Sequence, residues 1–129
     1  MFSGSIENYK IRSEIVSSAE IVGCHAIAIA PENIPEIRLV APQAADELLS
    51  ISNVDAAFVI YPVKDSVSIS ARSLGAVNVQ VIMELLGGGG HQTMAATQIP
   101  NITPEQAKSK LLDVLAELQK DENSDAVSS

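Results

Sequence analysis

Apolar and polar positions along the chain predict alternating helices and strands. Apolar residues recurring at helical spacing predict four helices, over residues 6–22, 41–51, 78–86 and 104–118. Short apolar runs and alternating segments predict four strands, at residues 25–30, 56–63, 66–72 and 96–99. The fold class is therefore α/β, a mixed sheet of about four or five strands with helices packed on both faces.

Two of these strands form an antiparallel hairpin, because only a short polar link separates residues 56–63 from residues 66–72. The first strand is continuously apolar, which is typical of a central strand. The second alternates strictly, and side chains alternate between the two faces of a sheet. This alternation places Ser68, Ser70 and Arg72 on one face and the apolar residues between them on the other.

Capping signals mark the helix ends. Ser5 is expected to cap the first helix and Gly23 to end it, while Pro42 suits the first turn of the second. Thr103 and Gln106 form a capping box for the last helix. Its apolar stripe is predicted at Ala107, Leu111, Val114 and Leu118.

A single domain is expected over residues 10–120, preceded by a linker at 1–9 and followed by a frayed acidic tail at 121–129. The third helix, over residues 78–86, is apolar almost all round and is predicted to be mostly buried. Only 3% of the residues are aromatic, so the core must be aliphatic.

The charge balance limits the kind of ligand. The chain carries 16 acidic and 8 basic residues, for a net charge of −8. A surface for long nucleic acids is usually basic, so such a partner is disfavoured. An anionic ligand would instead need a local cationic site.

The location is expected to be cytoplasmic. The lone cysteine, Cys24, rules out a disulfide within the chain. No apolar run approaches the roughly 20 residues that span a membrane, and the first ten residues contain no apolar signal region.

A run of four glycines is the most unusual feature. Gly87, Gly88, Gly89 and Gly90 lie between apolar segments and are followed by a histidine. Without side chains, backbone N–H groups can approach an anion closely, so the run suits a phosphate. It is neither a Walker loop nor a dinucleotide fingerprint, since the lysine and the spacing that these require are missing. A flexible loop is the alternative interpretation.

Two cations are candidates for holding that anion. Arg72 carries a guanidinium that can grip a phosphate through two parallel hydrogen bonds. His91 follows the glycines and can donate a hydrogen bond to a phosphate oxygen. The alternatives are a surface salt bridge for Arg72 and a backbone contact that holds the loop for His91. No role is assigned to His25.

The stretch "SISARSLGAVNVQVIMELLGGGGHQTMAATQI" resembles the DHH-associated domain that follows the catalytic domain in DHH-family phosphoesterases. The similarity rests on Ser70, Arg72 and Ser73, then "VNV", then "GGGGH" and a double alanine. With its flanking segments, residues 10–118 look closest to cyclic-di-AMP phosphodiesterases of the GdpP type, which are membrane-bound signalling enzymes.

The resemblance implies a substrate-binding domain that closes over a two-manganese site in the parent's own DHH domain. Arg72 and His91 would contact phosphate, and Gly87 to Gly90 would let the nucleotide approach. Ser70, Ser73 and Asn78 are weaker candidates. The implied partner is a cyclic dinucleotide or a short oligonucleotide, with linear pApA as the product of cyclic-di-AMP hydrolysis.

The chain departs from a complete enzyme of this family. It contains no "DHH" string and no Asp and His cluster with metal-ligand spacing, so catalysis is expected only in the parent. Two alternatives stay open. The same module occurs in oligoribonucleases, RecJ-type exonucleases and, more distantly, alanyl-tRNA synthetase. The second alternative is an interaction module, with Ala95 and Ala96 at a homodimer contact.

Overall fold

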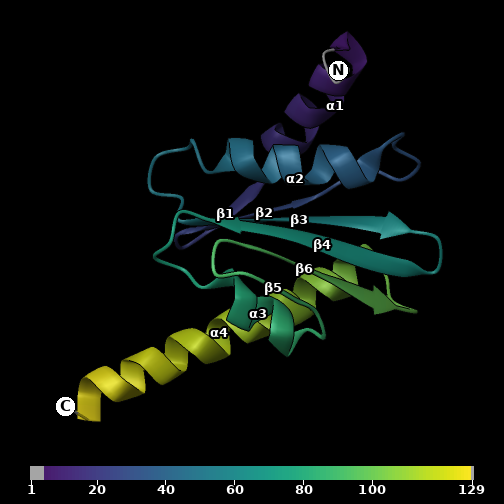
Figure 1. The fold of residues 1–129 in the computed structure, drawn as a ribbon. Helices are drawn as coiled ribbons and strands as arrows, with labels where there is room; N and C mark the ends of the chain where they lie inside the picture. Colours follow the sequence, from purple (N-terminus) through teal and green to yellow (C-terminus); the bar gives the residue numbers. More distant parts are fainter. Residues whose placement is uncertain (1–4, 129) are drawn as a thin grey trace.

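The computed structural model describes residues 5–128, with side chains described through residue 122. The described residues form one six-stranded sheet in the order β1-β2-β3-β4-β6-β5. Helices α1 and α2 lie on one face and α3 and α4 on the other (Figure 1). The strands are β1 (Glu20–Val22), β2 (His25–Ile29), β3 (Ala56–Val63), β4 (Ser66–Ser73), β5 (Gly89–Gly90) and β6 (Met94–Pro100). The helices are α1 (Ile6–Ser17), α2 (Ile37–Leu48), α3 (Val79–Leu85) and α4 (Pro104–Ser128).

The α/β class and the mixed sheet agree with the sequence. Strands β2 and β3 are parallel, and the remaining pairs are antiparallel. The predicted hairpin is confirmed, with β3 and β4 paired in register from Ala56 opposite Ser73 to Val63 opposite Ser66. The expected strand count is slightly low because the two short strands, β1 and β5, are not visible as apolar patterns.

Strand β3 lies between two hydrophobic layers. Phe58 and Ile60 face α3 and α4, whereas Val59 and Tyr61 face α1 and α2. Both faces of this strand are covered, which explains its continuously apolar sequence. The core is aliphatic apart from Phe58 and Tyr61.

The first helix ends at Ser17, so the prediction that it reaches residue 22 is wrong. The hydroxyls of Ser17 and Ser18 donate to backbone carbonyls of the last turns, at 2.8 Å each, and compete with helix continuation. The next residues pair instead with β2, where Glu20 lies opposite Ile27. Gly23 adopts a φ of +63° in the turn between these strands rather than at the helix end.

The second helix starts at Ile37, and Pro42 lies inside it rather than in its first turn. Its buried face, at the helical spacing of Val40, Ala41, Ala44, Ala45 and Leu48, packs on the sheet. This packing outweighs the missing backbone donor of Pro42, which a helix interior normally disfavours.

Helices α3 and α4 follow the capping signals. Asn78 caps α3, but Val81 and Leu85 are exposed, so the expected burial of this helix is only partly correct. The capping box of α4 is confirmed, since Thr103 and Gln106 each donate a backbone N–H to the other's side chain, at 2.9 and 3.1 Å. Helix α4 includes residues 121–128, where the sequence predicts a frayed tail. None of the described helices is both long and apolar enough to cross a membrane.

Candidate functional site

The α2 side of β4 carries the predicted polar face. Ser68 and Ser70 are buried there, while Val67, Ile69 and Ala71 face α3 and α4, as the alternation predicts. Helix α2 packs over β3 and β4. The next strand, β6, leaves Met94, Ala96 and Gln98 exposed on this same side. The sheet therefore has an uncovered face beside α2.

Arg72 lies at the end of this polar face. Its Nε is 3.5 Å from Oδ1 of Asp46 on α2, and its Nη1 donates to the carbonyl of the preceding residue, Ala71, at 3.0 Å. The two charged groups are close enough to form an ion pair, but the buried Nε of Arg72 makes no hydrogen bond. Asp46 is 63% exposed, and such pairs are weak in water. The guanidinium thus retains unused donors at the edge of the open face.

His91 lies in the tight hairpin between β5 and β6. Its backbone N–H donates to the Met94 carbonyl at 2.7 Å, and the Met94 N–H donates back at 3.3 Å. Met94 in turn lies opposite Arg72 in the β4–β6 ladder. Residues directly opposite each other share a face, so Arg72, Met94 and His91 form one cross-strand row. With strands about 4.8 Å apart, the Cα atoms of Arg72 and His91 are roughly 10 Å apart.

A second cross-strand row, made of small residues, lies next to the first. Ser70 is opposite Ala96, and Ala96 is opposite Gly89. These three positions carry at most a hydroxymethyl or a methyl group. They form a low floor beside the Arg72 and His91 side chains.

The backbone conformation or close packing favours glycine at three of the four positions in the run. A Cβ at Gly88 would lie 2.1 Å from the Ala96 carbonyl oxygen, and one at Gly90 would lie 2.5 Å from the Ala95 Cα. Gly87 follows α3 with a φ of +90°. Gly89 differs, because its φ is not positive and nothing lies within 4 Å of a Cβ placed there. The fold therefore does not require glycine at position 89.

The structure does not bring Ser73 and Asn78 into this face. The Ser73 hydroxyl donates to the Val77 carbonyl at 2.6 Å and accepts from the Gly75 N–H at 2.8 Å, which fixes the loop after β4. The Asn78 side chain caps α3 by accepting N–H groups at 3.0 and 3.3 Å. Their ligand roles stay predictions. Asp46 and Met94 are residues of this face that the sequence did not indicate.

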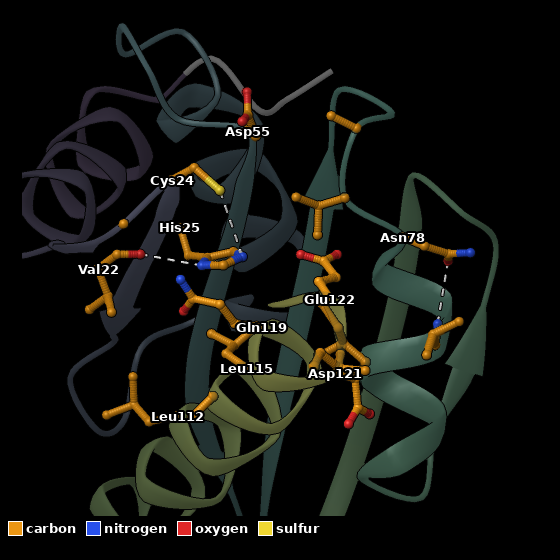
Figure 2. A pocket seen from close by; sticks show the side chains of 17 residues that line it. Val22, Cys24, His25, Asp55, Asn78, Leu112, Leu115, Gln119, Asp121 and Glu122 are labelled. Carbon is orange, nitrogen blue, oxygen red and sulfur yellow. Dashed lines mark hydrogen bonds between the residues drawn. The ribbon is translucent and has the colours of Figure 1, made fainter. Parts of the chain in front are cut away.

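A cavity of about 680 Å³ lies at the same end of the sheet, but on the opposite face, beside α3 and α4. Figure 2 shows Cys24 and His25 on one side of it and Asn78 on the other, with Glu122 between them. Asp55, Asp121 and Glu122 contribute carboxylates, whereas the described residues that line it include neither lysine nor arginine. This charge makes the cavity unsuitable for a phosphate.

Burial favours the neutral forms of the cysteine and histidine side chains in this cavity. It lowers the pKa of His25, whose Nδ1 lies 3.3 Å from the Val22 carbonyl oxygen. It also raises the pKa of the Cys24 thiol, and the nearby Asp55 carboxylate adds to that rise. A protonated thiol is a poor nucleophile, so this pair does not form a nucleophilic centre.

The described residues contain no group of three or more His, Cys, Asp or Glu side chains that could hold a metal ion. The residues present thus do not fit the two-manganese centre that the family resemblance implies, and no step through a metal is assigned to them.

Comparison with known proteins identifies the module. The DHHA1 domain family model matches residues 36–121. The chain belongs to the DHHA1 domain family. This match spans the region from α2 to α4, including the Arg72 and His91 row and all four glycines of the run.

Two curated relatives of this DHHA1 domain are bacterial phosphodiesterases. The chain is 47% identical over 114 residues to the cyclic-di-AMP phosphodiesterase GdpP of Geobacillus thermodenitrificans, covering 86% of this chain and 17% of that protein. It is 46% identical over 112 residues to the cyclic-di-AMP phosphodiesterase PdeA of Listeria monocytogenes, covering 85% of this chain and 17% of that one. The DHHA1 domain thus spans about a sixth of the length of these relatives.

The fold is also found in solved structures. An exopolyphosphatase-related protein of Bacteroides fragilis matches with a TM-score of 0.77 and 17% sequence identity, covering 88% of this chain and 35% of that one. At this identity the likeness concerns the fold of the DHHA1 domain alone.

Proposed function

We propose that this DHHA1 domain is the substrate-binding part of a cyclic-di-AMP phosphodiesterase. It holds cyclic-di-AMP and its linear product pApA on the open sheet face through Arg72 and His91. Hydrolysis itself belongs to the parent's DHH domain, where we expect the manganese ions. The identity to GdpP and PdeA, two proteins named as cyclic-di-AMP phosphodiesterases, supports this choice of substrate.

The observation that carries the proposal is the shared register of Arg72, Met94 and His91. It sets a guanidinium at the edge of α2 and an imidazole beyond Met94 at the two ends of one row, beside the part of the sheet that α2 does not cover. In a chain with a net charge of −8, such a pair is a local exception that suits an anion.

Each residue has a defined task in this account. Arg72 grips a phosphate with the donors that Asp46 and the Ala71 carbonyl leave free, and the restricted side chain keeps the guanidinium oriented. His91 donates a hydrogen bond to a phosphate oxygen, more strongly when it is protonated. Ser70, Ala96 and Gly89 provide a floor low enough for the ligand to approach the main chain. The domain thus positions the substrate and performs no bond cleavage.

Calorimetric titration of the 129-residue chain with cyclic-di-AMP and with pApA tests this function. We expect weak but measurable binding that Arg72→Ala and His91→Ala each reduce and that the double substitution abolishes. Arg38→Ala is the matched control, because Arg38 is an exposed arginine on α2 and its removal changes the net charge equally. Equal binding by the double variant and the unsubstituted chain would refute the assigned roles.

A further arm with a short oligoribonucleotide addresses the related exonuclease function. Tighter binding of the oligoribonucleotide than of either dinucleotide would favour a parent protein of the oligoribonuclease or RecJ-type exonuclease kind instead. Sedimentation with and without pApA distinguishes these two nucleotide-binding functions from a homodimerisation module. For such a module we expect self-association that the nucleotide leaves unchanged.

A further inference from the structure

An exposed apolar side chain lies between Arg72 and His91. Met94 is 52% exposed and is the cross-strand neighbour of both Arg72 and His91. Met94 pairs with Arg72 on one side and with His91 on the other, so a ligand that contacts Arg72 and His91 together must cover Met94. The adjacent Ser70–Ala96–Gly89 row is lower and leaves the thioether accessible from that side.

The chemistry of this position decides which part of a nucleotide lies over it. A phosphate placed on a thioether would lose water without gaining a hydrogen bond, which is unfavourable. An aromatic ring gains instead, because the polarisable sulfur of methionine attracts aromatic faces and edges. The described part of the open face offers no phenylalanine or tyrosine side chain to stack on a base, since Phe58 and Tyr61 are buried in the core layers.

We infer that Met94 is the platform on which a nucleobase of the bound nucleotide packs. This inference rests on the proposed function, because Arg72 must first hold a phosphate beside it. The base lies over the thioether while the phosphate occupies the guanidinium end of the row. Met94 therefore sets the preference of this face for nucleotides over phosphates without a base.

A matched ligand pair isolates this contact. AMP and ribose 5-phosphate share a phosphate and a sugar and differ in the base, so their affinity ratio measures the contribution of the base. We expect Met94→Ala to weaken AMP binding by about two- to tenfold, the range of a methionine–aromatic contact. Binding of ribose 5-phosphate should stay unchanged. Amide shifts in NMR titrations of the 129-residue chain are suited to such weak affinities.

Two further variants serve as controls. Met94→Leu keeps an apolar surface without sulfur and is expected to weaken AMP binding by less than Met94→Ala does. Leu85→Ala removes a similarly sized side chain, 58% exposed on α3 on the opposite side of the sheet, and should change neither affinity. Because Met94 is half exposed, its truncation leaves the core intact, and unchanged amide dispersion verifies this.

The outcomes separate this inference from the function beneath it. An unchanged AMP to ribose 5-phosphate ratio in Met94→Ala, with Arg72→Ala still abolishing binding, overturns the platform alone. Equal weakening of both ligands also overturns it, since Met94 would then act on the phosphate site. If AMP does not bind the unsubstituted chain, or if Arg72→Ala leaves its binding intact, the proposed function fails together with the platform.

Discussion

Two neighbouring glycine-to-alanine substitutions, Gly88→Ala and Gly89→Ala, distinguish the effect of the glycine run on folding from its effect on ligand binding. In Gly88→Ala the new Cβ would meet the Ala96 carbonyl oxygen at 2.1 Å and the Thr97 Cα at 2.6 Å. Both atoms belong to β6, which is paired on both sides and cannot move away freely. In Gly89→Ala nothing lies within 4 Å of the new methyl group.

These distances predict opposite effects on the free energy of unfolding. Overpacking of this kind usually destabilises by about 1–3 kcal/mol, which we expect for Gly88→Ala at the upper end. Gly89→Ala should be neutral or stabilising by up to about 1 kcal/mol, because alanine loses less backbone entropy than glycine in a strand. Urea unfolding followed by circular dichroism measures both values.

Binding should follow a different order. The Gly89→Ala methyl group raises the floor next to Ala96, where the ligand is proposed to lie, so it overpacks the occupied site. The same 1–3 kcal/mol range then corresponds to a loss of roughly 5- to 150-fold in pApA affinity in a stably folded variant. If Gly89→Ala instead binds pApA normally, the floor is not part of the ligand site. If it unfolds as readily as Gly88→Ala, the structural account of the glycine run is wrong.

Three other substitutions test the fold and the remaining site residues. Asn78→Ala should destabilise by about 1 kcal/mol through loss of the α3 cap, with pApA affinity unchanged; a large affinity loss in the folded variant would assign Asn78 to the site. Phe58→Ala should destabilise by about 3–5 kcal/mol in urea unfolding, because this fully buried ring is the largest side chain between β3 and α4, and a smaller loss would contradict the packing. Burial lowers the pKa of His25 below its usual 6.5, so the unfolded chain binds more protons as the pH falls through 6.5 and stability decreases there. His25→Gln should show a smaller drop in melting temperature between pH 7.5 and 5.5, and an equal drop would exclude this linkage.

Local signals predicted the parts of the fold that local chemistry determines. The alternation in β4 and the capping box at Thr103 each act within a few residues, and both are confirmed. The end of α1 was missed because Glu20 to Val22 owe their strand conformation to pairing with β2. Pro42 was misplaced for a similar reason, since packing of α2 on the sheet keeps the helix intact around it.

In the candidate site, too, local chemistry determines some features and tertiary packing determines the others. The face on which Arg72 lies follows from alternation alone. Its position relative to His91 depends on the β4–β6 register and on the pairing of β5, and two glycines carry no side-chain pattern that would reveal a strand. Asp46 lies 3.5 Å from Arg72 only because α2 packs across β4, a tertiary contact without a sequence signal.

The central claim is that the nucleotide occupies the α2 side of the sheet rather than the acidic cavity beside α3 and α4. Amide shift mapping of the labelled chain with pApA tests it most directly. We predict that the largest changes fall on Ser70, Arg72, Gly89, His91 and Met94. Changes confined to Cys24, Val77 and Leu115, which line the cavity across the sheet, would contradict it.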